Sequence, residues 1–364
     1  MANDNSKENK QTKIFEFVKY ILDYAYKEFS SIPKDFLTEI HLRFYRHNKK
    51  PNKKILGYWD FNQRVSKLGD FMVFLEYLNI LRHEFKLNIE NNKNIDICFI
   101  DDNHHYNSKI KKFSKTYQFK KAIKMLVLVN KHVDTVMTFA SNAEFERYYE
   151  QNRTRYIRWP ATVSGTLIAD CKRIEEFYQR KGCIPHFDLP PAIINEISAF
   201  YESHVYPAIP IIINIRQSKH DPNRNSESLE IKKFIEHYEK DKTYKFIIIC
   251  DKSEIREDFR TLNNVLFSKD YFSDIEYDLG FIKTSHVSIF PSSGMACFAW
   301  FSKTPFIQYG NHGYHEKFTS VKKGKTFNFF SQEQVVLHGN KTAAELISSF
   351  EELIARLKEK EILQ

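Results

Sequence analysis

The sequence predicts an α/β protein with two successive halves, each consisting of a mainly parallel β-sheet covered by helices. Strand-like apolar runs alternate with segments of helical periodicity along most of the chain, which is typical of parallel sheets. The segment "GCIPHFDLPPAI", residues 182–193, interrupts this alternation, and its three prolines oppose any regular element. A length of 364 residues also exceeds what one ordinary core accommodates.

The first half begins with a helical segment. Residues 13–33 carry apolar side chains at helical spacing, so we expect residues 1–45 to form a helical extension ahead of the first sheet. The first sheet domain is then expected at residues 46–190. Its strands are predicted at residues 53–60, 94–102, 124–130 and 134–140, and its helices at residues 71–85, 109–124 and 143–152.

The second half restarts the alternation. The stretch "AIPIIINIR", residues 208–216, is almost continuously apolar, as expected for a strand buried on both faces. Further strands are predicted at residues 244–251, 263–269, 286–294 (with its turn) and 304–310, and helices at residues 226–240, 274–285 and 295–303. We therefore expect a second sheet domain at residues 191–340 and a C-terminal helix at residues 341–364. Two such halves suggest Rossmann-like domains that face each other across a cleft.

The overall charge favours an anionic partner. The chain has 55 basic and 46 acidic residues and a net charge of +9, which suits nucleic acid, anionic lipid or a phosphorylated small molecule. The sequence has no RNP-type strand, helix-turn-helix or zinc-ligand spacing, so nucleic acid is not the expected partner. The five cysteines form no CxxC pair, so neither a metal site nor a disulfide framework is expected.

Two features bear on location. No run reaches the ~18 apolar residues of a membrane span, and the first residues lack the apolar core of a signal peptide, so we expect a cytoplasmic protein. The most basic segment, residues 109–124, has lysines spread around a helical wheel. A solvated helix face is one interpretation of this segment, and contact with the anionic inner surface of the membrane is the other.

The loop after the first strand of the second half predicts an anion site. Arg216 ends the strand, and Lys219, Arg224 and Asn225 follow before a helix whose N-cap is expected at Ser226. Forked and point positive charges, together with the N–H groups of a helix start, suit a phosphate or diphosphate. A surface loop with ordinary salt bridges is the alternative.

A second candidate anion site consists of Ser292, Ser293 and Gly294. These residues lie between an apolar strand and an apolar helix, where small residues let a ligand approach the backbone. Two hydroxyls and the N–H groups of a helix start suit phosphate oxygens. Serine and glycine at this position are also common helix caps. Their occurrence in the same half as Arg216 favours the anion-site interpretation.

Asp70 is the candidate general base. Gly69 gives a tight turn after the first strand, and Asp70 opens a long apolar helix. In open α/β sheets, ligands bind beyond the carboxyl ends of strands, where such loops lie. A carboxylate there is placed to take a proton from a hydroxyl nucleophile. An ordinary helix N-cap is the alternative role.

Three stretches together resemble the GT-B class of nucleotide-sugar-dependent glycosyltransferases. "LGDFMVFLEYLNILR" is similar to the glycine-aspartate helix opening of bacterial heptosyltransferase-like enzymes, and "INIRQSKHDPNRNS" resembles a loop of glycosyltransferases from surface-polysaccharide clusters. "FPSSGMACFAWFSKTPFIQYG" looks like the late strand-turn-helix that contacts the donor phosphates. The resemblance implies that Asp70 is the base, that Arg216 grips the donor diphosphate, and that the second domain holds the donor and the first the acceptor.

The resemblance implies a metal-independent glycosyltransferase without a further cofactor. Such an enzyme moves a sugar from a nucleotide-sugar donor to a hydroxyl of a glycan or glycolipid acceptor, here in capsule or lipopolysaccharide synthesis. The chain departs from the commoner GT-B pattern because it lacks the paired-glutamate motif, which leaves the donor and the inverting or retaining outcome open. A GT-B-like nucleotide-sugar epimerase and a non-catalytic module that binds anionic lipid or RNA are the alternatives.

Overall fold

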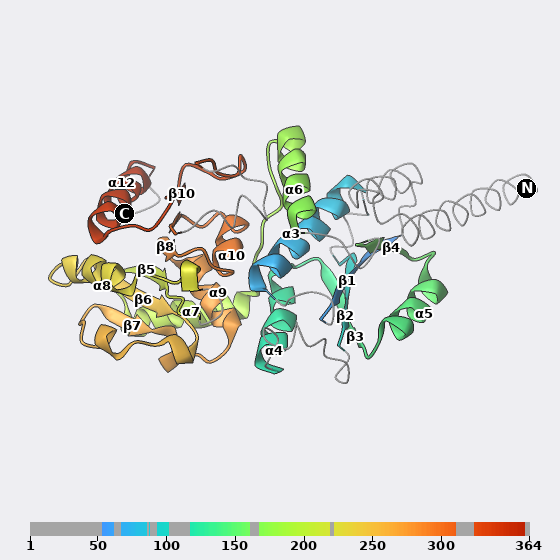
Figure 1. The fold of residues 1–364 in the computed structure, drawn as a ribbon, viewed down its shortest axis with the longest axis horizontal. Helices are drawn as coiled ribbons and strands as arrows, with labels where there is room; N and C mark the ends of the chain where they lie inside the picture. Colours follow the sequence, from blue (N-terminus) through green and yellow to red (C-terminus); the bar gives the residue numbers. More distant parts are fainter. Residues whose placement is uncertain are drawn as a thin grey trace, which may run out of the picture.

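Two separate parallel sheets form the framework of the molecule (Figure 1). The computed structural model describes residues 53–61, 67–85, 87, 93–101, 117–160, 167–218, 222–310 and 324–360. Within these ranges the strand orders are β3-β2-β1-β4 and β10-β9-β8-β5-β6-β7, and every strand pair is parallel. The α/β architecture with two sheets, expected from the sequence, is therefore confirmed. The helical extension expected at residues 1–45 lies outside the described residues.

The first sheet follows the prediction in three of its four strands. Its strands are β1 (Lys54–Asp60), β2 (Ile95–Ile100), β3 (Val133–Phe139) and β4 (Tyr156–Trp159). Its helices are α3 (Leu68–Glu84), α4 (Tyr117–Met125), α5 (Asn142–Asn152) and α6 (Leu167–Lys181). The strand predicted at residues 124–130 is wrong, because Leu126–Val129 form a 3-10 turn. A short apolar run does not by itself distinguish a strand from buried helical structure.

The second sheet has six strands, and all of those predicted are present. The strands are β5 (Ile209–Asn214), β6 (Tyr244–Ile249), β7 (Val265–Phe267), β8 (Val287–Phe290), β9 (Phe306–Gln308) and β10 (Gln334–Val336). The helices are α7 (Pro191–His204), α8 (Ser228–His237), α9 (Ile275–Thr284), α10 (Ala296–Trp300) and α12 (Ala343–Glu359). Helix α7 was not predicted. Pro191 lies in its first turn, where the missing N–H leaves no bond unmade.

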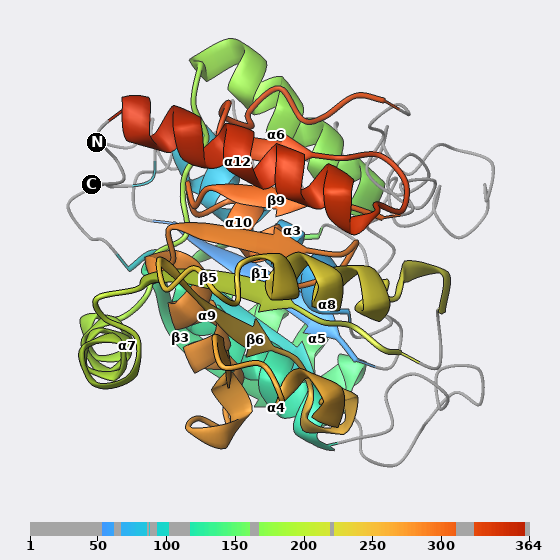
Figure 2. The same cartoon turned by 90° about the vertical axis from the view of Figure 1, so that its left-hand side faces the viewer.

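Helices cover both faces of both sheets. Helix α5 packs on the outer face of the first sheet, and α8 and α12 pack on the outer face of the second sheet, in the foreground of Figure 2. Helices α3 and α6 cover the inner face of the first sheet, and α7, α9 and α10 cover that of the second. One continuous apolar cluster extends through these inner layers, from Phe71 in α3 to Phe298 in α10 and Ile212 in β5. The two halves therefore share part of their core.

The proline-rich segment links the halves through close packing. Residues 182–190 form no helix or strand, whereas the predicted break extended to residue 193 and helix α7 already begins at Pro191. Phe187 is buried between Phe298 and Phe301, and its N–H donates to the Phe301 carbonyl at 2.7 Å. The next residue, Asp188, donates its N–H to the carbonyl of Val129 in the first half at 3.1 Å. The segment is thus fixed to both halves.

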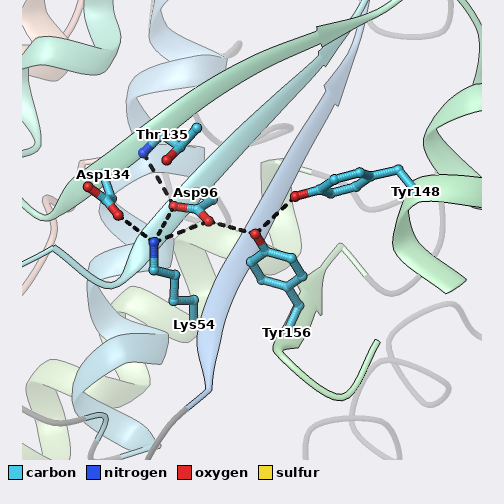
Figure 3. A network of polar contacts seen from close by, with 6 residues as sticks. All are labelled: Lys54, Asp96, Asp134, Thr135, Tyr148 and Tyr156. Atoms are coloured by element: carbon cyan, nitrogen blue, oxygen red, sulfur yellow. Dashed lines mark hydrogen bonds and ion pairs between the residues drawn. The ribbon is translucent and has the colours of Figure 1, made fainter. Parts of the chain in front are cut away.

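A buried polar network ties together the amino ends of the first sheet's strands (Figure 3). Asp96 of β2 is almost fully buried and accepts hydrogen bonds from Lys54 Nζ at 3.0 Å and from the Tyr156 hydroxyl at 2.8 Å. Lys54 also pairs with Asp134 of β3. Because these side chains come from four strands, the network joins the amino ends of the strands. The loops of the candidate site lie at the opposite, carboxyl ends.

No helix in the described part of the chain combines the length and the apolar character needed to cross a bilayer.

Candidate active site

The second sheet has the strand order of a nucleotide-binding sheet. Counted along the chain from β5, its strands lie in the order 3-2-1-4-5-6. The order reverses between β5 and β8, so the loops that follow these two strands diverge, which is where open α/β sheets bind ligands. Both candidate anion sites predicted from the sequence occupy these two loops. The first sheet has the same reversal between β1 and β4.

A hydrogen bond joins β5 to the turn after β8 at the place where the strand order reverses. The Ser293 hydroxyl donates to Asn214 Oδ1 at 2.7 Å, and Asn214 donates to the carbonyl of Ile249 at 3.0 Å. Ser292 is fully buried and Ser293 is almost fully buried. Both hydroxyls were predicted to suit phosphate oxygens. In the structure the Ser293 hydroxyl donates its proton to Asn214 and so connects the ends of β5 and β8, and a contact of either serine with a phosphate stays a prediction.

Arg216 is held inside its own loop. Its guanidinium donates from Nη1 to Asn225 Oδ1 at 2.8 Å, and the same oxygen accepts the N–H of Ser218 at 2.8 Å. Ser226, expected to cap the following helix, accepts the N–H of Arg216 at 3.0 Å instead. Helix α8 begins two residues later, with Glu227 at its N-cap and no side-chain cap. The loop is therefore held in place around Asn225. Lys219, also predicted as an anion ligand, lies outside the described residues.

Arg224 connects the two predicted anion sites. Its Nε donates to the carbonyl of Ser292 at 2.9 Å, which joins the loop after β5 to the turn after β8. The side chain is half-buried. Of the arginines predicted from the sequence, Arg224 is the one that the structure places beside the boundary between the halves.

Asp70 lies in the first turn of α3, directly beside the second half. The N-cap position of α3 is Lys67, which makes no side-chain cap bond, so Asp70 is not the N-cap. The adjacent Gly69 packs against Gly294 so closely that a Cβ at position 69 would lie 3.4 Å from the Cα of Gly294. A Cβ at position 294 would lie 2.9 Å from the backbone nitrogen of Gly69. The approach of the halves at this point therefore depends on the missing side chain of Gly294.

The charges of Asp70 and Arg224 both affect the pKa of the buried Cys297 thiol. Burial raises the pKa of the Cys297 thiol, the negative charge of Asp70 raises it further, and the positive charge of Arg224 lowers it. The thiol lies directly under Gly69, since a Cβ there would be 2.9 Å from its sulfur. Geometry connects the same two residues indirectly: Asp70 follows Gly69, which packs against Gly294 and Cys297, and Arg224 is hydrogen-bonded to Ser292 in the same turn. That Asp70 and Arg224 act on one substrate stays a prediction.

Two polar residues of the site were not predicted. Gln217 donates from its N–H to Glu254 Oε1 at 3.0 Å, and from its side chain to the Ser228 hydroxyl at 2.6 Å. Burial raises the pKa of the Glu254 carboxyl, while the Gln217 N–H and the charge of Arg216 lower it. One feature of the sequence could have indicated Glu254: it follows the buried strand β6, at the same carboxyl end of the sheet as Arg216.

The described lysines of the basic segment take part in ion pairs. Lys120 and Lys124 of α4 both pair with Asp101 at the end of β2. Lys121 pairs with Asp274 of the second half at 3.2 Å. These lysines hold α4 between the sheet and α9. Residues 109–116 lie outside the described residues, and the contact with an anionic membrane stays a prediction.

Among the described residues, no three histidine, cysteine, aspartate or glutamate side chains are grouped so that they could hold a metal ion.

The two-sheet architecture is that of solved glycosyltransferases. ADP-heptose lipopolysaccharide heptosyltransferase II of E. coli superposes with a TM-score of 0.53 at 9% identity, over 84% of this chain and 99% of that chain. The chain has the GT-B fold. A family 9 glycosyltransferase from Veillonella parvula also has it, with a TM-score of 0.50 at 11% identity, over 84% of this chain and 91% of that chain. The sequence matches no protein-family model and no curated protein. The GT-B fold implied by the sequence resemblance is therefore confirmed.

Proposed function

We propose that this GT-B chain is a glycosyltransferase that moves a sugar from a nucleotide-sugar donor to an acceptor hydroxyl in the synthesis of a bacterial surface glycan. The observation that carries the proposal is the close packing of Gly69, next to Asp70 in the first half, against Gly294 of the second half, in the turn to which Arg224 is hydrogen-bonded. A base and a diphosphate ligand on opposite halves suit a reaction between two substrates, each held by one half.

The second half holds the donor in this proposal. The loop after β5, at the strand-order reversal, contains Arg216, Arg224 and Asn225. It also contains Lys219, which lies outside the described residues. The charges and hydrogen bonds of these residues would neutralise the diphosphate as it leaves the sugar, which is the role that a divalent ion has in other transferases. The transferase is therefore proposed to work without a metal ion. The backbone at Gly294 would approach the same diphosphate.

Asp70 is the proposed base. The acceptor hydroxyl oxygen forms a bond to the anomeric carbon of the donor sugar, the bond from that carbon to the diphosphate breaks, and the hydroxyl proton passes to the Asp70 carboxylate. A glycan or glycolipid acceptor, bound on the first half, would present this hydroxyl. A mechanism of this kind gives inversion; retention would require a different role for Asp70.

A donor screen followed by substitution tests the proposal. A nucleotide sugar that binds raises the unfolding temperature, and ADP-heptose is tried first because the E. coli relative is named for it, followed by UDP-, GDP- and CMP-sugars. With the donor found, Asp70→Asn is expected to lower kcat by roughly 10²–10⁴-fold while the donor Kd stays unchanged. Asp188→Asn, an exposed aspartate of the linker, is the control and should keep full activity.

Three outcomes would contradict this function. Conversion of the donor without any acceptor identifies an epimerase. Salt-sensitive binding to long polyanions, with no response to any nucleotide sugar, identifies a non-catalytic module. Full turnover in the Asp70→Asn variant removes Asp70 from the role of base.

A further inference from the structure

β3 is an edge strand, and its face that carries Asp134, Val136 and Thr138 is open to solvent, while Met137 and Phe139 pack toward α5 on the other face. Among the described strands it pairs only with β2. It has seven residues, whereas the edge strands β7 and β10 of the second sheet have three each. Most of its side chains are exposed, and Val136 is 48% exposed. Long exposed edges present a row of backbone groups to other strands, and proteins normally shorten or cover them.

The backbone of β3 turns alternate groups toward β2 and toward the open edge. The N–H of Thr135 donates to the carboxylate of Asp96 in β2 at 3.3 Å, and the carbonyl of Phe139 accepts a hydrogen bond from the residue that follows β2 at 2.9 Å. Successive residues of a strand direct these groups to opposite sides. The N–H and carbonyl groups of Val136 and Thr138 therefore point to the open edge.

The sequence of β3 is self-complementary about Val136. If two copies of the strand lie antiparallel and are centred on this residue, Val136 faces its own counterpart and Asp134 faces Thr138. At the ends of the strand, Val133 faces Phe139. Val136 and Val133 thus face apolar residues, Met137 faces Thr135, and no like charges are directly opposed, which would be destabilising.

The one charge on the strand is already compensated. Asp134 pairs with Lys54, which also donates to Asp96 at 3.0 Å (Figure 3). Inward-facing or unpaired charges are a common protection of edge strands against association. Because Lys54 neutralises Asp134 within the first half, this protection is missing at β3.

We propose that β3 is a homodimer interface, in which two copies of the chain pair antiparallel about Val136 and join their first sheets into one continuous sheet. The backbone groups of Val136 pair with those of Val136 in the second copy and exchange two hydrogen bonds, and those of Thr138 also face that copy. Asp134 lies where the register between β2 and β3 shifts, so the regular pairing is centred on Val136. The second copy fits because the strand is complementary to itself. A ribbon of this length is a small interface, so the dimer exchanges with the monomer and grows with protein concentration.

Sedimentation velocity of the full chain over a wide range of concentrations tests the interface. Val136→Lys places two ammonium groups opposite each other at the dimer axis, so it should weaken dimerisation by about tenfold or more. Leu229→Lys makes the same kind of change at an exposed residue of α8, 63% exposed, and should leave dimerisation unchanged. Both positions are exposed, and the unfolding midpoints of the variants check that folding is intact.

A second pair of variants tests the register. Thr138→Asp places a carboxylate opposite Asp134 of the second copy and should weaken the dimer, whereas Thr138→Lys at the same position should leave it intact or strengthen it. A chain that is monomeric at every concentration overturns the proposal. A dimer that Val136→Lys leaves unchanged, or that responds equally to both Thr138 variants, also overturns it.

Discussion

Gly294→Ala should separate the two halves at the proposed active site. A Cβ at position 294 would lie 2.9 Å from the nitrogen of Gly69 and 2.9 Å from the Cβ of Leu68, whereas ordinary contact begins at 3.4 Å. The start of α3 and the turn after β8 must therefore separate by about 0.5 Å, the difference between these distances. Backbone opposes the new atom, so no side-chain rotation relieves the clash. Asp70, next to Gly69, moves with α3.

The expected effect follows from this displacement. Overpacking of this kind destabilises a protein by about 1–3 kcal/mol. A catalytic group misplaced by about 1 Å loses on the order of 10²-fold in rate, so a shift of about half that size should lower kcat by roughly tenfold. The donor Kd should change less than kcat, because the donor ligands Arg216 and Arg224 belong to the same half as Gly294 and only the approach of the Gly294 backbone to the diphosphate is affected.

Gly69→Ala provides the matched comparison. Its Cβ would meet the sulfur of Cys297 at 2.9 Å, which is a side-chain atom that can be removed. Cys297→Ala should therefore restore the stability and turnover of Gly69→Ala, but not those of Gly294→Ala. Denaturant unfolding of the single and double variants measures the contact, and steady-state kinetics with donor-binding calorimetry measures the positioning of Asp70.

Two results would refute this reasoning. One is a Gly294→Ala variant with unchanged unfolding free energy and unchanged kcat, and the other is its rescue by Cys297→Ala. The unfolding comparison stands even if the chain transfers no sugar, so it separates an error about the contact from an error about the reaction.

Three further predictions concern other residues. Burial raises the pKa of the Glu76 carboxyl well above its ordinary 4.5, so the native state holds a proton that the unfolded state releases. The free energy of unfolding should therefore fall by up to roughly 1.4 kcal/mol per pH unit as pH rises above 4.5. Denaturant unfolding against pH should show that Glu76→Gln removes this slope, whereas the exposed Glu236→Gln does not. Asp96→Asn should cost about 3 kcal/mol of unfolding free energy, because it leaves a buried amide facing Lys54; an unchanged midpoint in urea would contradict this. Arg224→Lys should weaken donor binding in calorimetry by roughly tenfold, because lysine lacks the forked group that contacts the diphosphate and the turn after β8 at once; equal affinity would show that a point charge suffices.

Most of the strands that were predicted are buried on both faces, whereas β3 was predicted although most of its side chains are exposed. β5, with the run "IPIIIN", is continuously apolar because helices cover both sides of the second sheet. β4 was missed because it has only four residues and contains Arg158. That arginine is buried because its guanidinium stacks on Tyr58 and Phe145 and pairs with Glu146 at 2.7 Å. Its partners lie in other elements, Glu146 and Phe145 in α5 and Tyr58 in β1, so no pattern within the four-residue strand indicates them.

The site was predicted at the level of loops but not of contacts. Asp70 and Arg224 were predicted from their positions after buried strands, a property that depends on the sequence near each residue. The burial of Ser292 and Ser293 depends on how β5 and β8 lie side by side. The close contact at Gly69 depends on how the two halves pack. A glycine, serine or arginine can serve either in packing or in ligand binding, and the sequence does not distinguish the two roles. These distances could therefore be obtained only from the three-dimensional structure.

The apolar cluster that runs through Phe71, Phe187 and Phe298 limits how the molecule could be divided or recombined. A fragment that ends in the proline-rich segment would expose its inner helices to water and tend to aggregate. Exchanging the donor half with that of another GT-B enzyme at this segment would also create a mismatched interior. A working chimera would have to carry over the residues of α10 that pack against α3 and those of α9 that pack against α4, so the boundary for protein engineering differs from the boundary between the sheets.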